Sequence, residues 1–112
     1  MLISHPQDTV DVIGRTVTLK CSSNLSEPVW WTMTKPQSIN DVVIYPGPDI
    51  VDNRIRVDKT DRYQNLIIQN ISFDDAGQYK CIDDNGFGLD KGHWASAELT
   101  IIGLTSTNLN YI

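Results

Sequence analysis

Apolar and polar residues alternate along most of the chain, which is the pattern of strands that bury one face in a sheet. The alternation is clearest in TVTLKC at 16–21, NLIIQNI at 65–71 and AELTII at 97–102. These runs are rich in Thr, Val and Ile, which strands favour. No segment keeps a helical period, and the prolines of PGPD at 46–49 are incompatible with a helix there. The pattern therefore predicts about seven to nine short strands.

Turn-forming residues separate these runs at intervals of roughly eight to twelve residues. They include Gly14, Pro46-Gly47-Pro48, Asp74 to Gly77, and Asn85-Gly86. Short strands at this spacing favour an all-β antiparallel sandwich. The final segment, GLTSTNLNYI, departs from the alternation. We therefore expect one domain over residues 1–102 and a C-terminal extension or the start of a linker over residues 103–112.

Length and charge narrow the class of protein. The 112 residues are 40% apolar and 21% charged, which fits one globular domain. A net charge of −5 with scattered Lys and Arg argues against nucleic-acid and anionic-membrane partners. The chain has no apolar run of transmembrane length, and MLISHPQ lacks the features of a signal peptide. We expect a mature soluble protein or an excised domain, without direct membrane insertion of this fragment.

The cysteine count bears on compartment and chemistry. Cys21 and Cys81 are the only cysteines, so a Cys-x-x-Cys motif and a second pair for zinc are both missing. One long-range disulfide is the favoured interpretation, and it implies an oxidising compartment. Such a bridge stabilises a fold by roughly 4 kcal/mol. The alternative is a pair of buried free thiols.

Several short motifs follow one another in a set order. They are Cys21, Val29-x-Trp31, Arg54-Ile55, Leu66-x-Ile68, Asp75-x-Gly77-x-Tyr79-x-Cys81 and Leu99-x-Ile101. Over about residues 3–102 this series resembles strands B, C, D, E, F and G of an immunoglobulin-superfamily domain. The resemblance implies an immunoglobulin-like two-sheet sandwich with one inter-sheet disulfide. The variable-type Phe-Gly-x-Gly bulge is missing from strand G, so an intermediate-set or truncated variable-like domain is favoured.

The resemblance also implies structural roles for a set of residues, namely Cys21, Cys81, Trp31, Arg54, Leu66, Asp75, Gly77 and Tyr79. The two cysteines would join the sheets beside the tryptophan ring. The tyrosine hydroxyl would bond back to the backbone at the E–F corner, where the glycine permits a tight path. The aspartate would pair with the arginine of strand D and close one end of the sandwich.

Strand parity then points to a binding face. If Trp31 and Cys81 face the core, their neighbours on strands C, F and G face outward. With strand C′ this predicts a face formed by Trp30, Thr32, Val43, Tyr45, Lys80, Ile82 and Trp94. Large apolar side chains are costly to leave in water, and aromatic residues dominate interface hot spots. The alternative is that long loops or the lysine cover these side chains.

The segment DDNGFGLDKGH at 83–93 is a second binding candidate, since it is long, glycine-rich and at a sandwich end. Its candidate residues are Asp83, Asp84, Asn85, Phe87 and Leu89. Asn85-Gly86 is also simply a good turn. The acidic pair lacks the ligand pattern of an EF-hand loop, so we expect neither a metal nor a cofactor.

Two sequons, Asn24-Leu25-Ser26 and Asn70-Ile71-Ser72, make Asn24 and Asn70 candidate glycosylation sites. Chance alone gives about one sequon in a chain of this composition. Catalysis is not expected. The only histidines are His5 and His93, and no nucleophile elbow, phosphate loop or His-Glu-x-x-His motif is present.

The sequence thus predicts an extracellular glycoprotein domain of a cell-surface receptor or cell-adhesion molecule. It would bind a protein through the C–C′–F–G face, either a second copy as a homodimer or a different protein. One alternative is a secreted or surface receptor domain of the immune system that binds ligand through its end loops. Another is an intracellular muscle-type module with a structural role, which would not need a disulfide.

Overall fold

The computed structural model describes residues 2–24, 29–40, 42–45, 54–59, 64–83 and 93–103, with the side chain of Tyr45 outside this description. The strands are β1 (Leu2–Ser4), β2 (Thr9–Val12), β3 (Val17–Leu19), β4 (Ser22–Ser23), β5 (Trp30–Thr34), β6 (Val42–Tyr45), β7 (Ile55–Asp58), β8 (Asn65–Ile68), β9 (Gly77–Ile82) and β10 (Trp94–Ile102). A single-turn 3-10 helix, η1 (Phe73–Asp75), precedes β9. Of the extension expected over residues 103–112, the structure describes only Gly103.

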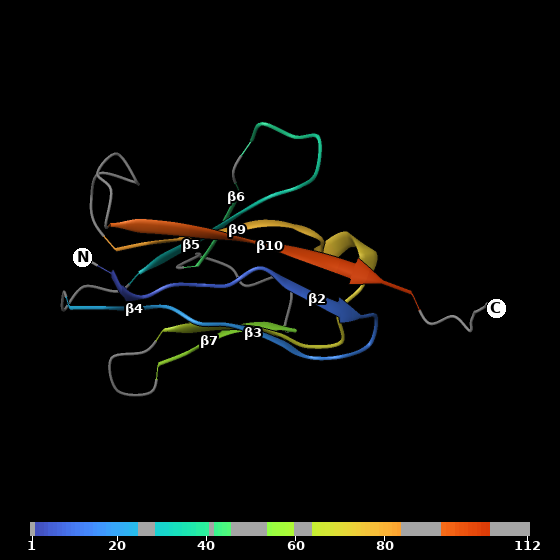
Figure 1. Ribbon diagram of the computed structural model, residues 1–112, viewed down its shortest axis with the longest axis horizontal. Helices are drawn as coiled ribbons and strands as arrows, with labels where there is room; N and C mark the ends of the chain where they lie inside the picture. Colours follow the sequence, from blue (N-terminus) through green and yellow to red (C-terminus); the bar gives the residue numbers. More distant parts are fainter. Residues whose placement is uncertain are drawn as a thin grey trace.

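The strands form two packed layers (Figure 1). A five-stranded sheet has the order β2-β10-β9-β5-β6, and a three-stranded sheet has the order β3-β8-β7. A short pair, β1 with β4, stands beside them. Neighbouring strands are antiparallel except β2 and β10, which run parallel along the edge of the larger sheet. The expected all-β two-sheet sandwich is confirmed.

The predicted disulfide joins the two layers. Cys21 follows β3 and is bonded to Cys81 of β9, with their Cα atoms 6.6 Å apart. Trp31 lies directly opposite Cys81 in the β5–β9 ladder and is fully buried. Its indole N–H donates to the carbonyl of Gln64, 3.0 Å away, so the ring buries no unpaired donor. The bridge and the tryptophan therefore form one central cluster, as the resemblance implied.

The alternating pattern of the sequence becomes an alternating pattern of burial. In β10, Ala97, Leu99 and Ile101 are buried, whereas the residues between them are exposed. In β8, Leu66 and Ile68 are buried in the same way. Each large apolar side chain removed from water contributes roughly 1.5–3 kcal/mol, so these rows account for much of the stability. β10 begins at Trp94, three positions before the expected strand, because its pairing with β9 starts there, with Trp94 opposite Ile82.

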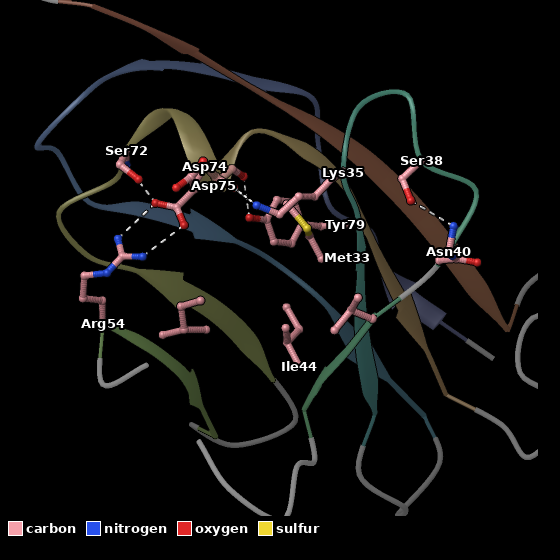
Figure 2. Close-up of a pocket in the computed structure, with 12 residues that line it drawn as sticks. Met33, Lys35, Ser38, Asn40, Ile44, Arg54, Ser72, Asp74, Asp75 and Tyr79 are labelled. Carbon is pink, nitrogen blue, oxygen red and sulfur yellow. Dashed lines mark hydrogen bonds and ion pairs between the residues drawn. The ribbon is translucent and has the colours of Figure 1, made fainter. Parts of the chain in front are cut away.

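One end of the sandwich carries the predicted clasp (Figure 2). The Arg54 guanidinium donates two bonds to the Asp75 carboxylate, at 3.0 and 3.1 Å. The backbone N–H of Ser72 donates a further bond to the same carboxylate at 2.8 Å. The Tyr79 hydroxyl donates to the backbone carbonyl of Asp75 at 2.5 Å. The structure therefore shows the charge pair and the tyrosine corner where the sequence placed them.

Gly77 is required at this corner because the backbone of β5 passes close to it. A Cβ atom at this position would lie 2.5 Å from the carbonyl oxygen of Thr34. That separation is shorter than real Cβ contacts, and the neighbouring atom belongs to backbone that cannot move away cheaply. The tight path that the sequence predicted is therefore set by inter-strand contact as well as by the turn.

Candidate functional site

The outer face of the five-stranded sheet is built from two aligned rows of residues. In the first row, Trp30 of β5 and Trp94 of β10 both lie opposite Ile82 of β9. In antiparallel strands, directly opposed residues project from the same face and approach within about 5 Å at their Cβ atoms. Register alone therefore brings these three apolar side chains, far apart in sequence, into one continuous row.

The middle residue of this row is buried. Ile82 is only 3% exposed, yet it does not belong to the core cluster between the sheets. The sequence predicted an exposed Ile82, and that exposure was wrong. Ile82 stands on a central strand, with a larger residue opposite it on each neighbouring strand. Both tryptophans are half-buried.

The second row lies one pair further along the strands. Thr32 of β5 and Ser96 of β10 lie opposite Lys80, and Val43 of the edge strand β6 lies opposite Thr32. Thr32 is only 6% exposed because it is enclosed by strands on both sides, so its expected exposure was wrong as well. Val43, at the edge of the sheet, is 46% exposed.

Lys80 connects the two rows. Its Nζ lies 5.0 Å from the centre of the Trp94 ring, within the range of a cation–π interaction. The lysine covers part of that ring, as the alternative interpretation of this face anticipated, but Trp94 keeps partial exposure. Tyr45 contributes its backbone to β6 opposite Trp31, and its side chain lies outside the description.

The base of the candidate loop holds a buried polar cluster that the sequence did not reveal. The Asp83 side chain is completely buried. It accepts a hydrogen bond from the hydroxyl of Ser23 and another from Nδ1 of His93, 2.7 Å away. The backbone N–H of Asp83 also donates to the carbonyl of His93 at 2.9 Å. The cluster thus ties β4, β9 and β10 together at the end of the sandwich opposite the clasp.

Burial opposes ionisation of Asp83, but its hydrogen-bond donors outweigh burial. Bonds from Ser23 and His93 hold the pKa of the carboxyl below its usual range. Asp83 is therefore a structural anchor, and its expected role as an exposed loop contact was wrong. Asp84, Asn85, Phe87 and Leu89 lie outside the described residues.

The order of the groups in this cluster does not suit nucleophilic catalysis. A serine nucleophile needs its hydroxyl to donate to an imidazole. Here the hydroxyl of Ser23 donates to the carboxylate, which stands between it and the imidazole of His93. Among the described residues, no group of three or more His, Cys, Asp or Glu side chains is placed to hold a metal ion.

The pairing of Asp83 with His93 follows from the positions of their neighbours on the two strands. Ile82 and Trp94 were assigned to neighbouring strands, so the next residues outward, Asp83 and His93, face each other across the hairpin. Ser23 lies 60 positions from Asp83, and no local pattern joins them. The hairpin half of the cluster could therefore have been predicted, and the Ser23 half could not.

A groove of about 630 Å³ opens between the edge strands β6 and β7 (Figure 2). Met33, Ile44 and Ile55 provide apolar lining, and Lys35 and Asp74 lie at the end near the clasp. The Lys35 ammonium donates to the backbone carbonyl of Asp74 at 3.2 Å. This groove could not be predicted from the sequence, because it depends on how the two sheet edges are spaced.

The two sequon asparagines, Asn24 and Asn70, are both exposed. Within the described ranges, no helix has the length and apolar character needed to cross a bilayer.

Comparison with known proteins agrees with the fold. A family model described as an immunoglobulin domain matches residues 1–85. Among curated proteins, the human leucine-rich repeats and immunoglobulin-like domains protein 1 is 28% identical over 95 residues, covering 82% of this chain and 7% of the relative. The chain therefore spans only a small part of that relative's length.

Two solved structures of titin are similar over almost the whole chain. The I9–I11 tandem is 25% identical with a TM-score of 0.66, covering 92% of this chain and 33% of the tandem. The single domain I10 is 18% identical with a TM-score of 0.65, covering 90% of this chain and 96% of that domain. The likeness to I10 concerns the fold alone.

Proposed function

Because the chain belongs to the immunoglobulin-domain family, we propose that it is a protein-recognition domain of a cell-surface receptor or adhesion molecule. It binds its protein partner through the outer face of β5, β6, β9 and β10. The observation that carries this proposal is the row of Trp30, Ile82 and Trp94, which lies outside the core cluster and leaves two tryptophans partly in water.

The row has the physical features of an interface anchor. Its side chains stand on paired strands, so little conformational entropy would be lost when a partner packs against them. Ile82 lies opposite both tryptophans and is itself buried. Tryptophan is enriched among residues whose truncation costs an interface more than about 2 kcal/mol. Burying the exposed parts of both rings would therefore supply affinity from a small, rigid area.

The surroundings of the row provide polar complementarity. Lys80 sits beside Trp94, and Gln78, Ser96 and Glu98 follow on β9 and β10. An apolar anchor bordered by charged and hydrogen-bonding groups is the usual anatomy of a specific protein interface. Val43 extends the apolar area to the sheet edge. The partner is a protein, either a second copy of this chain or a different molecule.

An extracellular location is supported by the disulfide between Cys21 and Cys81, since such bridges persist in oxidising compartments. The curated relative combines immunoglobulin-like domains with leucine-rich repeats in its name, which agrees with a multidomain receptor. The titin neighbours favour the alternative of an intracellular structural module. Counting thiols in the native protein separates these: a quantitative disulfide agrees with export, and two free thiols would favour the structural module.

The second candidate surface is the loop between β9 and β10. A binding role there, as in an immune-type receptor, now has to rest on residues 84–92, because Asp83 is buried at the loop base. Catalysis forms no part of either proposal, since immunoglobulin domains are generally non-enzymatic.

The test uses the domain displayed as a tetramer against a panel of extracellular proteins, with sedimentation equilibrium to detect self-association. Trp30→Ser and Trp94→Ser should each weaken the binding found by at least about 30-fold. Ile39→Ser is the matched control, because Ile39 is 96% exposed and lies in the turn after β5. Unchanged affinity in both tryptophan variants, with folding intact, would exclude this face.

A further inference from the structure

A small apolar hollow lies beside one of the two sequons, at the clasp end of the sandwich. Asn70 follows β8 in a left-handed backbone conformation, with φ of +49°, and it is exposed. Its carbonyl accepts a bond from the Arg54 guanidinium at 2.9 Å. The next residue, Ile71, exchanges backbone bonds with Arg15 and Gly14 at 3.0 and 2.8 Å. The backbone at the sequon is therefore fixed on both sides.

The hollow has a volume of about 320 Å³ and is lined by Ile13, Gly14, Asn70, Ile71, Ser72 and Phe73. Ile71 is only 1% exposed, whereas Phe73 is 61% exposed. A Cβ atom built on Gly103 would meet the tip of the Phe73 ring at 3.4 Å, so the ring tip lies near the backbone where β10 ends. The rest of this large apolar ring is left in water, which is costly.

We propose that Asn70 carries an N-linked glycan, and that its first N-acetylglucosamine rests in this hollow with its apolar ring face against Phe73. The inference rests on the extracellular part of the proposed function, because the sequon is glycosylated only on the secretory route. The volume is at the lower end of the roughly 300–1,000 Å³ typical of ligand pockets. A sugar attached to a residue that lines the hollow is held at a high effective concentration beside it.

The second sequon provides an internal contrast. Asn24 is exposed after β4, but it lines neither this hollow nor the groove between β6 and β7. Within the described residues, we therefore expect the Asn70 glycan, rather than one at Asn24, to change the stability of the fold.

The experiment begins with secretion of the domain from a eukaryotic host and peptide mass spectrometry of Asn70 occupancy. Melting temperatures are then compared before and after treatment with an amidase that removes the glycan and leaves aspartate. Removal should lower Tm by about 4 °C in the wild-type domain and by less than about half of that in Phe73→Ala. Ile39→Ala should keep the full wild-type loss, because Ile39 is exposed and does not line the hollow.

Asn70→Asp is the matched sequon variant, because aspartate tolerates the left-handed conformation and equals the product of enzymatic removal. Ser72→Ala also destroys the sequon, but it breaks the capping box of η1. Should Phe73→Ala fail to fold, proton–proton NMR contacts between the sugar and the Phe73 ring provide the same test. Such contacts are expected in the glycosylated wild-type protein.

Three results would overturn the proposal: an unmodified Asn70 in secreted folded protein, equal losses of Tm in wild type and Phe73→Ala, or missing sugar–ring contacts. These results leave the proposed binding face untouched, because Asn70→Asp should bind the partner as wild type does. Conversely, loss of the face proposal through the tryptophan variants would not alter Asn70 occupancy.

Discussion

Each end of the sandwich contains a buried carboxylate, and the two are held in different ways. Asp75, 6% exposed, receives two bonds from the guanidinium of Arg54 and one from a backbone N–H three residues away. Asp83, 2% exposed, receives its side-chain bonds from the hydroxyl of Ser23 and the ring of His93. The carboxylate of Asp75 is held by a permanent positive charge and by nearby backbone. The carboxylate of Asp83 is held by a neutral hydroxyl and a titratable imidazole that come from other strands.

The two ends of the sandwich therefore serve different purposes. The end with Asp75 is a rigid clasp, because a guanidinium keeps its charge at every pH at which proteins fold. The end with Asp83 borders both the tryptophan row and the base of the loop that follows β9. Its anchor holds His93, which directly precedes Trp94 of the proposed binding face.

The largest expected effect comes from breaking the clasp. Arg54→Met leaves the Asp75 carboxylate buried without its cation and also removes donors to the carbonyls of Gln69 and Asn70. We expect the free energy of unfolding to fall by about 3 kcal/mol, measured by urea denaturation. Arg15→Met is the control, since Arg15 pairs with Asp11 at the surface and should cost at most about 1 kcal/mol. Equal losses in the two variants would mean that the Arg54–Asp75 pair contributes no more stability than a surface ion pair.

The second prediction concerns the tyrosine corner, at the same end of the sandwich as the clasp. Tyr79→Phe removes the hydroxyl and leaves the buried carbonyl of Asp75 without that donor. The loss should be about 1–3 kcal/mol by the same denaturation assay. Burial strongly raises the pKa of Tyr79; the charge of Asp75 raises it further, and the charge of Arg54 lowers it in part. The phenol therefore stays protonated and remains a donor in alkaline solution. A loss below about 0.3 kcal/mol would show that the bond adds nothing.

At the opposite end, Asp83→Asn keeps the shape of the side chain and removes its charge. It should cost about 1–2 kcal/mol, because the hydroxyl and the imidazole lose a charged acceptor. Asp74→Asn provides the control, since Asp74 is exposed beside the clasp and should be nearly neutral. If the two variants behave alike, the Asp83 cluster does not anchor the fold.

The smallest expected effect is a difference in acid sensitivity. Because the folded-state pKa of Asp83 is lowered, its contribution is complete above the unfolded pKa of about 3.9 and is lost as the pH falls through the folded value. The stability gap between wild type and Asp83→Asn should therefore be smaller below pH 4 than at pH 5. Denaturation curves across this range measure it, and a gap that widens in acid would contradict the assignment.

The comparison also shows what a sequence can disclose. The clasp was predictable because Asp75, Gly77 and Tyr79 stand at fixed short spacings on one corner. The sandwich and its disulfide followed from alternation and ordered motifs. The Asp83 anchor was mistaken for an exposed loop contact, because its partner Ser23 comes from another strand.

The sequence predicted which residues lie on the candidate face better than it predicted how exposed they are. Parity placed Trp30, Ile82 and Trp94 on one side, and the register confirms that row. Parity does not say which neighbours are large enough to shelter a side chain, so the burial of Ile82 and Thr32 was missed. The groove between β6 and β7 depends on sheet spacing, which no local pattern encodes.

The central claim is that partners bind on the sheet face beside the Asp83 anchor. Hydroxyl-radical footprinting of the domain, alone and saturated with its binding partner or self-associated, tests it most directly. We expect the oxidation of Trp30 and Trp94 to fall several-fold in the complex, while the oxidation of Phe73 stays unchanged. Protection confined to residues 84–92 or to Phe73, with both tryptophans oxidised as before, would contradict it.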